Sequence, residues 1–216
     1  MLIDGKEVRC ESGENLLKVA LRNGIYIPNL CFIEEEDEQP ACCRLCFVEI
    51  EGEADPKCAC TTKTEDGMRV TTKGERAYRL QKTAFELIMS NHPVDCGNCG
   101  KNGVCELQKI SKVLRIRLKT EKYQKFLNAY PIDRSSRVFI FDPNKCVQCG
   151  KCVYLSSKLG LECLSFAYRG FKRRVTTFLD APIGTTKCGD IDAFVRICPV
   201  GAFTFKGEEK SEGGDS

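Results

Sequence analysis

The spacing of hydrophobic and polar residues predicts a small mixed domain at the start of the chain, over residues 1–75. Asp4-Gly5 separates two short strand-like segments, and this residue pair favours the tight turn of a β-hairpin. Further on, apolar residues recur at the spacing of a helix that ends near Gly24. The predicted elements are hairpin strands at 2–3 and 7–8, a helix around 16–21, and strands at 47–50 and 68–71. This order of elements is typical of a β-grasp domain.

The hydrophobic period becomes helical from Glu75 to Asn91, and His92-Pro93 ends it because proline cannot continue a helix. The predicted apolar face consists of Ala77, Leu80, Ala84, Leu87 and Ile88. Residues 109–144 are basic and mixed, which predicts a connector with little core. The last residues, rich in Glu, Gly and Ser, predict a disordered tail. The predicted domains span 1–75, 76–128 and 129–206, with the tail at 207–216.

Cysteine is far more frequent than in ordinary proteins, with 16 in 216 residues. The N-terminus has no basic segment followed by an apolar run, so we expect no secretory signal and a reducing, cytoplasmic location where thiols stay available to metals. No stretch approaches the length of a membrane span, and the mean hydropathy is −0.27. Lys and Arg total 33 against 30 Asp and Glu, and a formal charge of +3 does not by itself indicate nucleic acid.

The first cysteine group has the pattern C-x11-C-x2-C-x13-C and consists of Cys31, Cys43, Cys46 and Cys60. Four soft thiolates within a β-grasp domain suit a [2Fe–2S] cluster. Cys42 and Cys58 compete for the second and fourth positions, but only Cys43 gives a C-x2-C pair with Cys46. A zinc site is the alternative, although four-cysteine zinc sites more often contain two such pairs.

The only histidine of the chain stands just before a second cysteine group. The pattern H-x3-C-x2-C-x5-C consists of His92, Cys96, Cys99 and Cys105. Three glycines in this segment allow the backbone to wrap closely around a bulky group. A lone histidine is more often a surface or capping residue. Here, however, three cysteines would leave a [4Fe–4S] cluster one ligand short, so His92 is predicted to be the fourth ligand.

These motifs resemble the iron–sulfur subunits of NADH-linked electron-transfer complexes. The family includes the N-terminal part of the large iron–sulfur subunit of complex I, the small diaphorase subunit of NAD-reducing hydrogenases, and the front domains of [FeFe]-hydrogenases. The matching segments are residues 43–49, 65–68, 92–108 and 165–170. The resemblance implies a protein wire in which electrons enter from, or leave towards, a flavin subunit that oxidises NADH.

The third cysteine group begins with the C-x2-C-x2-C run of a bacterial ferredoxin, but Ser156 stands where its fourth cysteine would be. In two-cluster ferredoxins the fourth cysteine of each run binds the other cluster, so a distant Cys-Pro dipeptide is expected. Cys198-Pro199 provides it. The predicted ligands of a further [4Fe–4S] cluster are therefore Cys146, Cys149, Cys152 and Cys198.

The second cluster of such ferredoxins is predicted to be lost. Counting back from Cys198 gives Phe194 and Ile191 at two of its ligand positions, and Ser156 removes a third thiolate. The two large apolar side chains can fill the space that this cluster would occupy. Cys188 is then a leftover thiol. We interpret the five remaining cysteines as small buried hydrophobic residues or surface thiols, namely Cys10, Cys42, Cys58, Cys163 and Cys188.

One [2Fe–2S] and two [4Fe–4S] clusters predict an electron-transfer subunit with no catalytic residues of its own. The predicted fold class is α+β and multidomain, with a β-grasp domain, a small helical domain and a bacterial ferredoxin-like domain. No dinucleotide-binding motif is present, so we expect NADH to bind a separate flavin subunit. The other expected partner is a hydrogenase, a formate dehydrogenase or a quinone-reducing module.

Two alternatives to this function remain. A zinc-stabilised scaffold or nucleic-acid adaptor is supported only by the basic runs at 115–122 and 169–174, and such runs are usually solvated faces. A free-standing ferredoxin is the other alternative. Because a diffusing carrier needs only one cluster, three centres favour a fixed relay.

Overall fold

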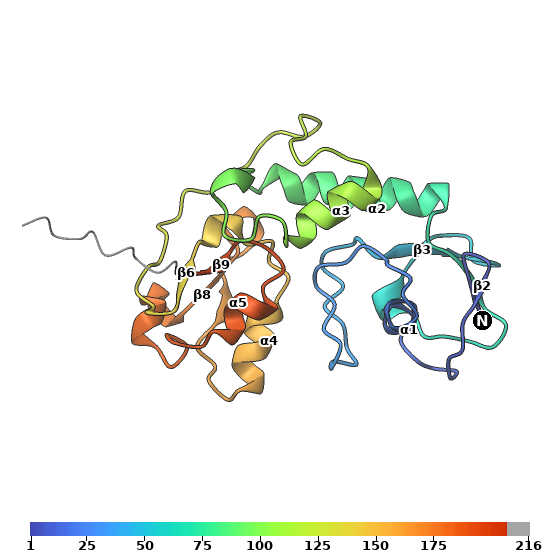
Figure 1. Ribbon diagram of the computed structural model, residues 1–216, viewed down its shortest axis with the longest axis horizontal. Helices are drawn as coiled ribbons and strands as arrows, with labels where there is room; N and C mark the ends of the chain where they lie inside the picture. The colour runs from blue at the N-terminus through green and yellow to red at the C-terminus, as the bar shows by residue number, and fades with distance from the viewer. Residues whose placement is uncertain (207–216) are drawn as a thin grey trace, which may run out of the picture. The chain divides into compact units, whose positions relative to one another are not determined.

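The computed structural model of the chain describes residues 1–206 and divides into two compact units. The first unit contains residues 1–94 and 106–127, and the second contains 95–105 together with the chain from residue 128 (Figure 1). The predicted tail at 207–216 lies outside the described residues. None of the helices within residues 1–206 is long and apolar enough to cross a membrane.

The first unit contains a five-stranded mixed sheet in the order β2-β1-β5-β3-β4. Its strands are β1 (Leu2–Ile3), β2 (Lys6–Glu7), β3 (Phe47–Ile50), β4 (Lys57–Cys58) and β5 (Arg69–Thr71). Only β1 and β5 pair in parallel. The hairpin turn is the predicted one, with Asp4 and Gly5 at φ of 50° and 78°, values that this type of tight turn requires. The four predicted strands are therefore confirmed within a residue or two, whereas β4 was not predicted.

Helix α1 (Leu16–Arg22) and the 3₁₀ turn η1 (Ala59–Thr61) complete this part of the first unit. Leu16, Leu17, Val19 and Ala20 are fully buried in one core with the inward residues of the sheet. Cys46, Cys58 and Cys60 belong to the same core, so hydrophobic packing holds these three cysteines in position.

The helix predicted from residue 75 is present as α2 (Glu75–Ser90), and Ala77 is buried as predicted, but the predicted apolar face is wrong at Leu80 and Leu87. Leu80 and Leu87 are 39% and 51% exposed, whereas Gln81 and Phe85 are buried. The physical reason is that α2 packs on β3, where the Gln81 side-chain amide donates a hydrogen bond of 2.7 Å to the Phe47 carbonyl. A satisfied polar side chain can therefore occupy the buried face.

A second helix, α3 (Glu106–Leu114), contradicts the prediction that residues 109–144 form a connector with little core. Leu107, Ile110 and Leu114 are buried at helical spacing. Helix α3 packs against α2, and the Tyr78 hydroxyl donates to the Leu114 carbonyl at 3.0 Å (Figure 1). Because the stretch is rich in basic residues, its composition did not predict this short amphipathic helix.

The second unit contains two small antiparallel sheets and two helices (Figure 1). Its main elements are β6 (Phe139–Phe141), α4 (Lys151–Lys158), β7 (Ser165–Ala167), β8 (Arg174–Thr176), α5 (Ala193–Ile197) and β9 (Phe203–Phe205). Strand β6 pairs with β9, and β7 pairs with β8, both antiparallel. Short 3₁₀ turns lie at Cys96–Asn98, Pro143–Lys145, Gly170–Lys172, Phe178–Asp180 and Ile183–Thr185.

Four phenylalanines form the centre of the second unit. Phe203 stacks on Phe141 and Phe194 with ring centroids 4.5 and 5.8 Å away, and Phe139 meets Phe203 edge to face at 5.3 Å. Phe194 is completely buried. It fills core space, as predicted for the position where a ferredoxin with two clusters would have a cysteine.

Candidate iron–sulfur sites

Six cysteines of the first unit form two groups of three, joined by the turn from Cys43 to Cys46. In the first group, the Cys31 thiol lies within hydrogen-bonding reach of both Cys42 and Cys43. In the second group, the Cys46 thiol reaches both Cys58 and Cys60. All six except Cys42 are buried. The structure therefore pairs Cys31 with Cys43 and Cys46 with Cys60, and it adds one of the two predicted competitors to each pair.

Local hydrogen bonds hold the second group in place. The Ala59 amide donates to the Cys46 carbonyl at 2.9 Å, which ties η1 to the turn before β3. Asn15 caps α1 through its side-chain oxygen, 3.1 Å from the Lys18 amide, while its side-chain nitrogen donates to the Cys60 carbonyl at 2.6 Å. One asparagine thus fixes both the start of α1 and the backbone of Cys60.

Contacts between thiols and burial control the protonation of these cysteines. The hydrogen bond with Cys42, together with burial, raises the pKa of Cys31. The Cys31 thiol and then burial raise the pKa of Cys43 well above its usual range. In the metal-free chain these thiols therefore keep their protons near neutral pH, and a metal that binds here must displace them.

Four cysteines of the second unit line one small cavity. They are Cys146, Cys149, Cys152 and Cys198, and the rest of the wall includes Val175, Val200 and Phe203. Cys152 lies in the first turn of α4, and Cys198 directly follows α5. Burial raises the pKa of Cys146 to about 12, although the Gln148 amide donates to its sulfur at 3.3 Å. The structure thus brings together the four cysteines predicted as ligands of one cluster, although 45 residues separate the last two.

Cys188 is fully buried, as predicted, but it is not a leftover thiol, because Cys163 lies against it. The two side chains meet, and their Cα atoms are 6.1 Å apart, within the range that a disulfide would allow. The Ser156 hydroxyl lies 3.5 and 3.8 Å from the two sulfurs and accepts from the Cys163 amide at 2.9 Å. Nothing in the sequence showed that Cys163, 25 residues from Cys188, would complete this group.

The four residues of the histidine-containing motif do not belong to one unit. His92 follows α2 in the first unit, where its backbone amide donates to the Met89 carbonyl at 3.4 Å. Cys96, Cys99 and Cys105 lie in the second unit, on a loop that starts with the 3₁₀ turn Cys96–Asn98. The role of His92 as a ligand stays a prediction.

The loop of residues 95–105 packs on α5 and on the segment that follows it. The Lys101 ammonium donates to the Val195 carbonyl at 2.8 Å. Gly201 approaches the loop so closely that a Cβ atom there would overlap the Cys99 sulfur. A Cβ atom on Gly100 would lie 3.0 Å from that of Thr204. Two glycines therefore permit the Cys99 loop to meet the chain three residues after Cys198.

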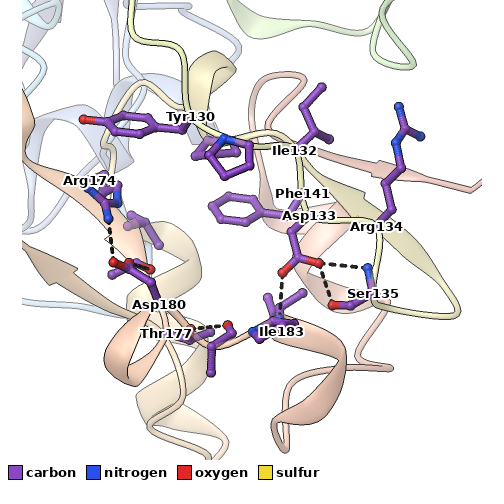
Figure 2. Close-up of a pocket in the computed structure, with 16 residues that line it drawn as sticks. Tyr130, Ile132, Asp133, Arg134, Ser135, Phe141, Arg174, Thr177, Asp180 and Ile183 are labelled. Carbon is purple, nitrogen blue, oxygen red and sulfur yellow. Dashed lines mark hydrogen bonds and ion pairs between the residues drawn. The ribbon is translucent and has the colours of Figure 1, made fainter.

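The largest cavity described in the second unit has no cysteine in its wall (Figure 2). Its volume is about 500 Å³, and Figure 2 shows Tyr130, Ile132, Phe141 and Arg174 around it. The Arg174 guanidinium pairs with the Asp180 carboxylate at 2.7 Å and lies 4.7 Å from the Tyr130 ring centroid. Arg174 and Asp180 therefore neutralise each other. Because no cysteine lines this cavity, we look for the redox centres at the cysteine groups instead.

The donor chemistry of these thiols suits iron–sulfur cores. Within residues 1–206, no three His, Cys, Asp or Glu side chains are arranged around one metal ion. Iron–sulfur cores do not need such an arrangement, because four protein ligands are shared among two or four irons. Buried thiol pairs in the first unit and a four-cysteine wall in the second therefore fit soft-metal cores.

Comparison with protein families defines the class of this chain. Residues 1–75 match the 2Fe-2S iron-sulfur cluster binding domain. Residues 81–118 match the NADH-ubiquinone oxidoreductase-G iron-sulfur binding region, and residues 138–204 match the ferredoxin-like domain of NADH-quinone oxidoreductase subunit 3. The chain is an iron–sulfur protein of mixed α and β structure, with one 2Fe–2S domain and 4Fe–4S binding regions.

More specifically, the chain is similar to subunits of NADH-linked oxidoreductases and of hydrogenases. It is 33% identical to the NADPH-Fe(3+) oxidoreductase subunit alpha of Geobacter sulfurreducens over 95% of its own length and 24% of that protein. It is 29% identical to the mitochondrial NADH-ubiquinone oxidoreductase 78 kDa subunit of Neurospora crassa over 95% of its length and 27% of the relative. The chain thus spans about a quarter of these curated relatives.

A solved structure shows the same similarity along nearly the whole chain. A chain in the crystal structure of an NAD+-reducing [NiFe]-hydrogenase in the H2-reduced state matches with a TM-score of 0.78 and 29% identity. The match covers 97% of this chain and 88% of the other. The resemblance that the cysteine motifs indicated is therefore confirmed.

Proposed function

We propose that the chain holds three clusters and relays single electrons through them. The [2Fe–2S] cluster is bound by Cys31, Cys43, Cys46 and Cys60. One [4Fe–4S] cluster is bound by His92, Cys96, Cys99 and Cys105. The other [4Fe–4S] cluster is bound by Cys146, Cys149, Cys152 and Cys198. When bound, these clusters supply one-electron redox chemistry, while the protein sets their spacing, burial and net charge.

The observation that supports this proposal is the packing of the Cys99 loop on α5 and on the segment after Cys198. The Lys101–Val195 hydrogen bond and the close approach of Gly201 to Cys99 put ligands of both proposed four-iron clusters in one compact unit. Electron tunnelling falls steeply with distance, so a relay requires neighbouring centres. A scaffold stabilised by separate metal ions would have no such requirement.

The proposed partners are a subunit that binds flavin and NADH, and a second redox subunit. The relatives' names support this proposal, because they are subunits of an NADPH-Fe(3+) oxidoreductase, an NADH-ubiquinone oxidoreductase and an NADP-reducing hydrogenase. The second partner is a hydrogenase, a formate dehydrogenase or a quinone-side module. A reducing, cytoplasmic compartment suits free thiol ligands.

Reduction by NADH tests the proposal directly. Anaerobically purified chain should show visible absorption from thiolate-to-iron charge transfer, and reduction by dithionite should produce one two-iron and two four-iron signals by electron paramagnetic resonance (EPR). NADH alone should leave the absorption unchanged, whereas NADH with the flavoprotein partner should bleach it. Bleaching of the isolated chain by NADH, or a colourless protein that contains zinc, would contradict the proposed function.

A further inference from the structure

The first unit supplies more thiols than a two-iron cluster uses. A [2Fe–2S] core takes four cysteine thiolates, two for each iron. The two thiol groups of the first unit contain six. Each group holds one proposed ligand pair and one additional thiol, Cys42 in the first group and Cys58 in the second.

Cys42 is placed to replace Cys43. The two residues are adjacent in sequence, and both thiols lie within hydrogen-bonding reach of the Cys31 thiol. Ala41 and Arg44, which flank them, have φ of 47° and 53°, so the backbone turns sharply on either side of the two cysteines. Both thiols therefore approach Cys31, although Cys43 is buried and Cys42 is exposed.

Cys58 is placed to replace Cys60. It lies on β4 opposite Phe47 and is only 7% exposed. Its thiol lies within hydrogen-bonding reach of the Cys46 thiol. The Arg44 guanidinium donates to the Cys58 sulfur at 3.6 Å, a contact that holds this side chain beside Cys46. Cys60 contacts the same Cys46 thiol from η1.

We propose that Cys42 and Cys58 are reserve ligands of the [2Fe–2S] cluster, one for each iron. In an exchange at the first iron, the bond from iron to the Cys43 sulfur breaks and a bond to the Cys42 sulfur forms. The proton of the Cys42 thiol passes to the departing Cys43 thiolate, so neither iron nor sulfur changes oxidation state. The second iron exchanges Cys60 for Cys58 in the same way. This inference rests on the proposed function of the first unit.

Paired substitutions test the reserve ligands. Cys43→Ala and Cys60→Ala should each keep a two-iron cluster in most molecules, with EPR g values shifted from those of the native chain because the ligand has changed. Cys42→Ala/Cys43→Ala and Cys58→Ala/Cys60→Ala should each lose it, which removes about two iron atoms per chain. The four-iron signals in the same samples report whether the rest of the protein has folded and loaded.

Cys10 provides the matched control, because its half-buried thiol packs beside the same core but outside both thiol groups. Cys10→Ala/Cys43→Ala removes as many thiols as the first double variant and should behave like Cys43→Ala. Loss of the two-iron signal in this control or in either single variant, with the four-iron signals intact, would overturn the inference. Retention of the signal in both double variants would overturn it too. If the native chain has no two-iron signal, the proposed function itself fails.

Discussion

Gly201→Ala tests whether the Cys99 loop really packs on the segment after Cys198. The added Cβ atom would overlap the Cys99 sulfur and lie 3.4 Å from the Lys145 Cδ atom. The overlap is closer than 3.0 Å, so the sulfur must retreat by at least about 0.5 Å to reach an ordinary separation of roughly 3.5 Å. Because the overlap is closer than 3.0 Å, the retreat exceeds the roughly 0.5 Å within which a functional site must hold its groups. In the cluster-free chain a thiol can rotate away, but a thiolate bound to iron cannot, so the substitution should selectively weaken one four-iron centre.

EPR of the reduced protein measures this effect. Gly201→Ala should reduce or shift the signal of the centre that contains Cys99, while the two-iron signal persists. Gly97→Ala is the matched control, since it lies in the same loop and its added Cβ atom would meet nothing within 4 Å. Gly100→Ala should give an intermediate effect because its Cβ atom would lie 3.0 Å from Thr204 Cβ. Equal signals from Gly201→Ala and Gly97→Ala would refute the contact.

Three further tests address other parts of the second unit and of the proposed sites. Cys198→Ala and Cys146→Ala should each abolish the same centre, seen as the loss of one four-iron signal. Loss of that signal with Ser156→Ala, and not with Cys198→Ala, would contradict the assignment of Cys198 as the fourth ligand. His92→Cys should lower the midpoint potential of one four-iron centre in a redox titration because a thiolate adds negative charge, whereas unchanged midpoints would remove His92 as a ligand. Phe194→Ala should lower the free energy of unfolding by about 3–5 kcal/mol in urea titrations, since it empties a fully buried aromatic position. A loss below about 1 kcal/mol would show that the site is loosely packed.

Local features of the first unit could be predicted because each depends on a few neighbouring residues. The hairpin around Asp4-Gly5 requires two positive φ values, and this pair of residues accepts them readily. Strand β3 (Phe47–Ile50) has the predicted bounds, and α2 starts at the predicted residue. Turn chemistry and hydrophobic period are properties of the sequence itself, so the elements that depend on them can be predicted without knowledge of the tertiary structure.

The predictions from the sequence are wrong where tertiary contacts determine which residues are buried. The buried side of α2 contains Gln81, because the Phe47 carbonyl across the unit accepts its hydrogen bond. Helix α3 was missed since only Leu107, Ile110 and Leu114 mark it within a strongly basic stretch. In both cases the burial of a side chain depends on its tertiary partner, and the hydrophobic period of one segment does not reveal that partner.

Ligand spacing showed which cysteines belong to a motif, but not what the other cysteines contact. The grouping of Cys146, Cys149, Cys152 and Cys198 followed from the known crossing of ferredoxin ligands, and the structure places all four on one cavity wall. The pairing of Cys163 with Cys188 had no such template. Likewise, the presence of Cys42 and Cys58 beside the predicted ligands emerges only from the folded loop.

The predicted iron content of the chain depends on the place where a ferredoxin with two clusters would bind its second one. Phe194 is fully buried in the aromatic core, and the Ser156 hydroxyl is committed to the Cys163 amide. Cys163 lies against Cys188, so the Cys188 sulfur has a neighbour as well. A cluster at this place would have to break these contacts and would still lack thiolates. Anaerobically purified chain should therefore contain about ten iron atoms, and a content of about fourteen would show that a third four-iron cluster had been wrongly dismissed.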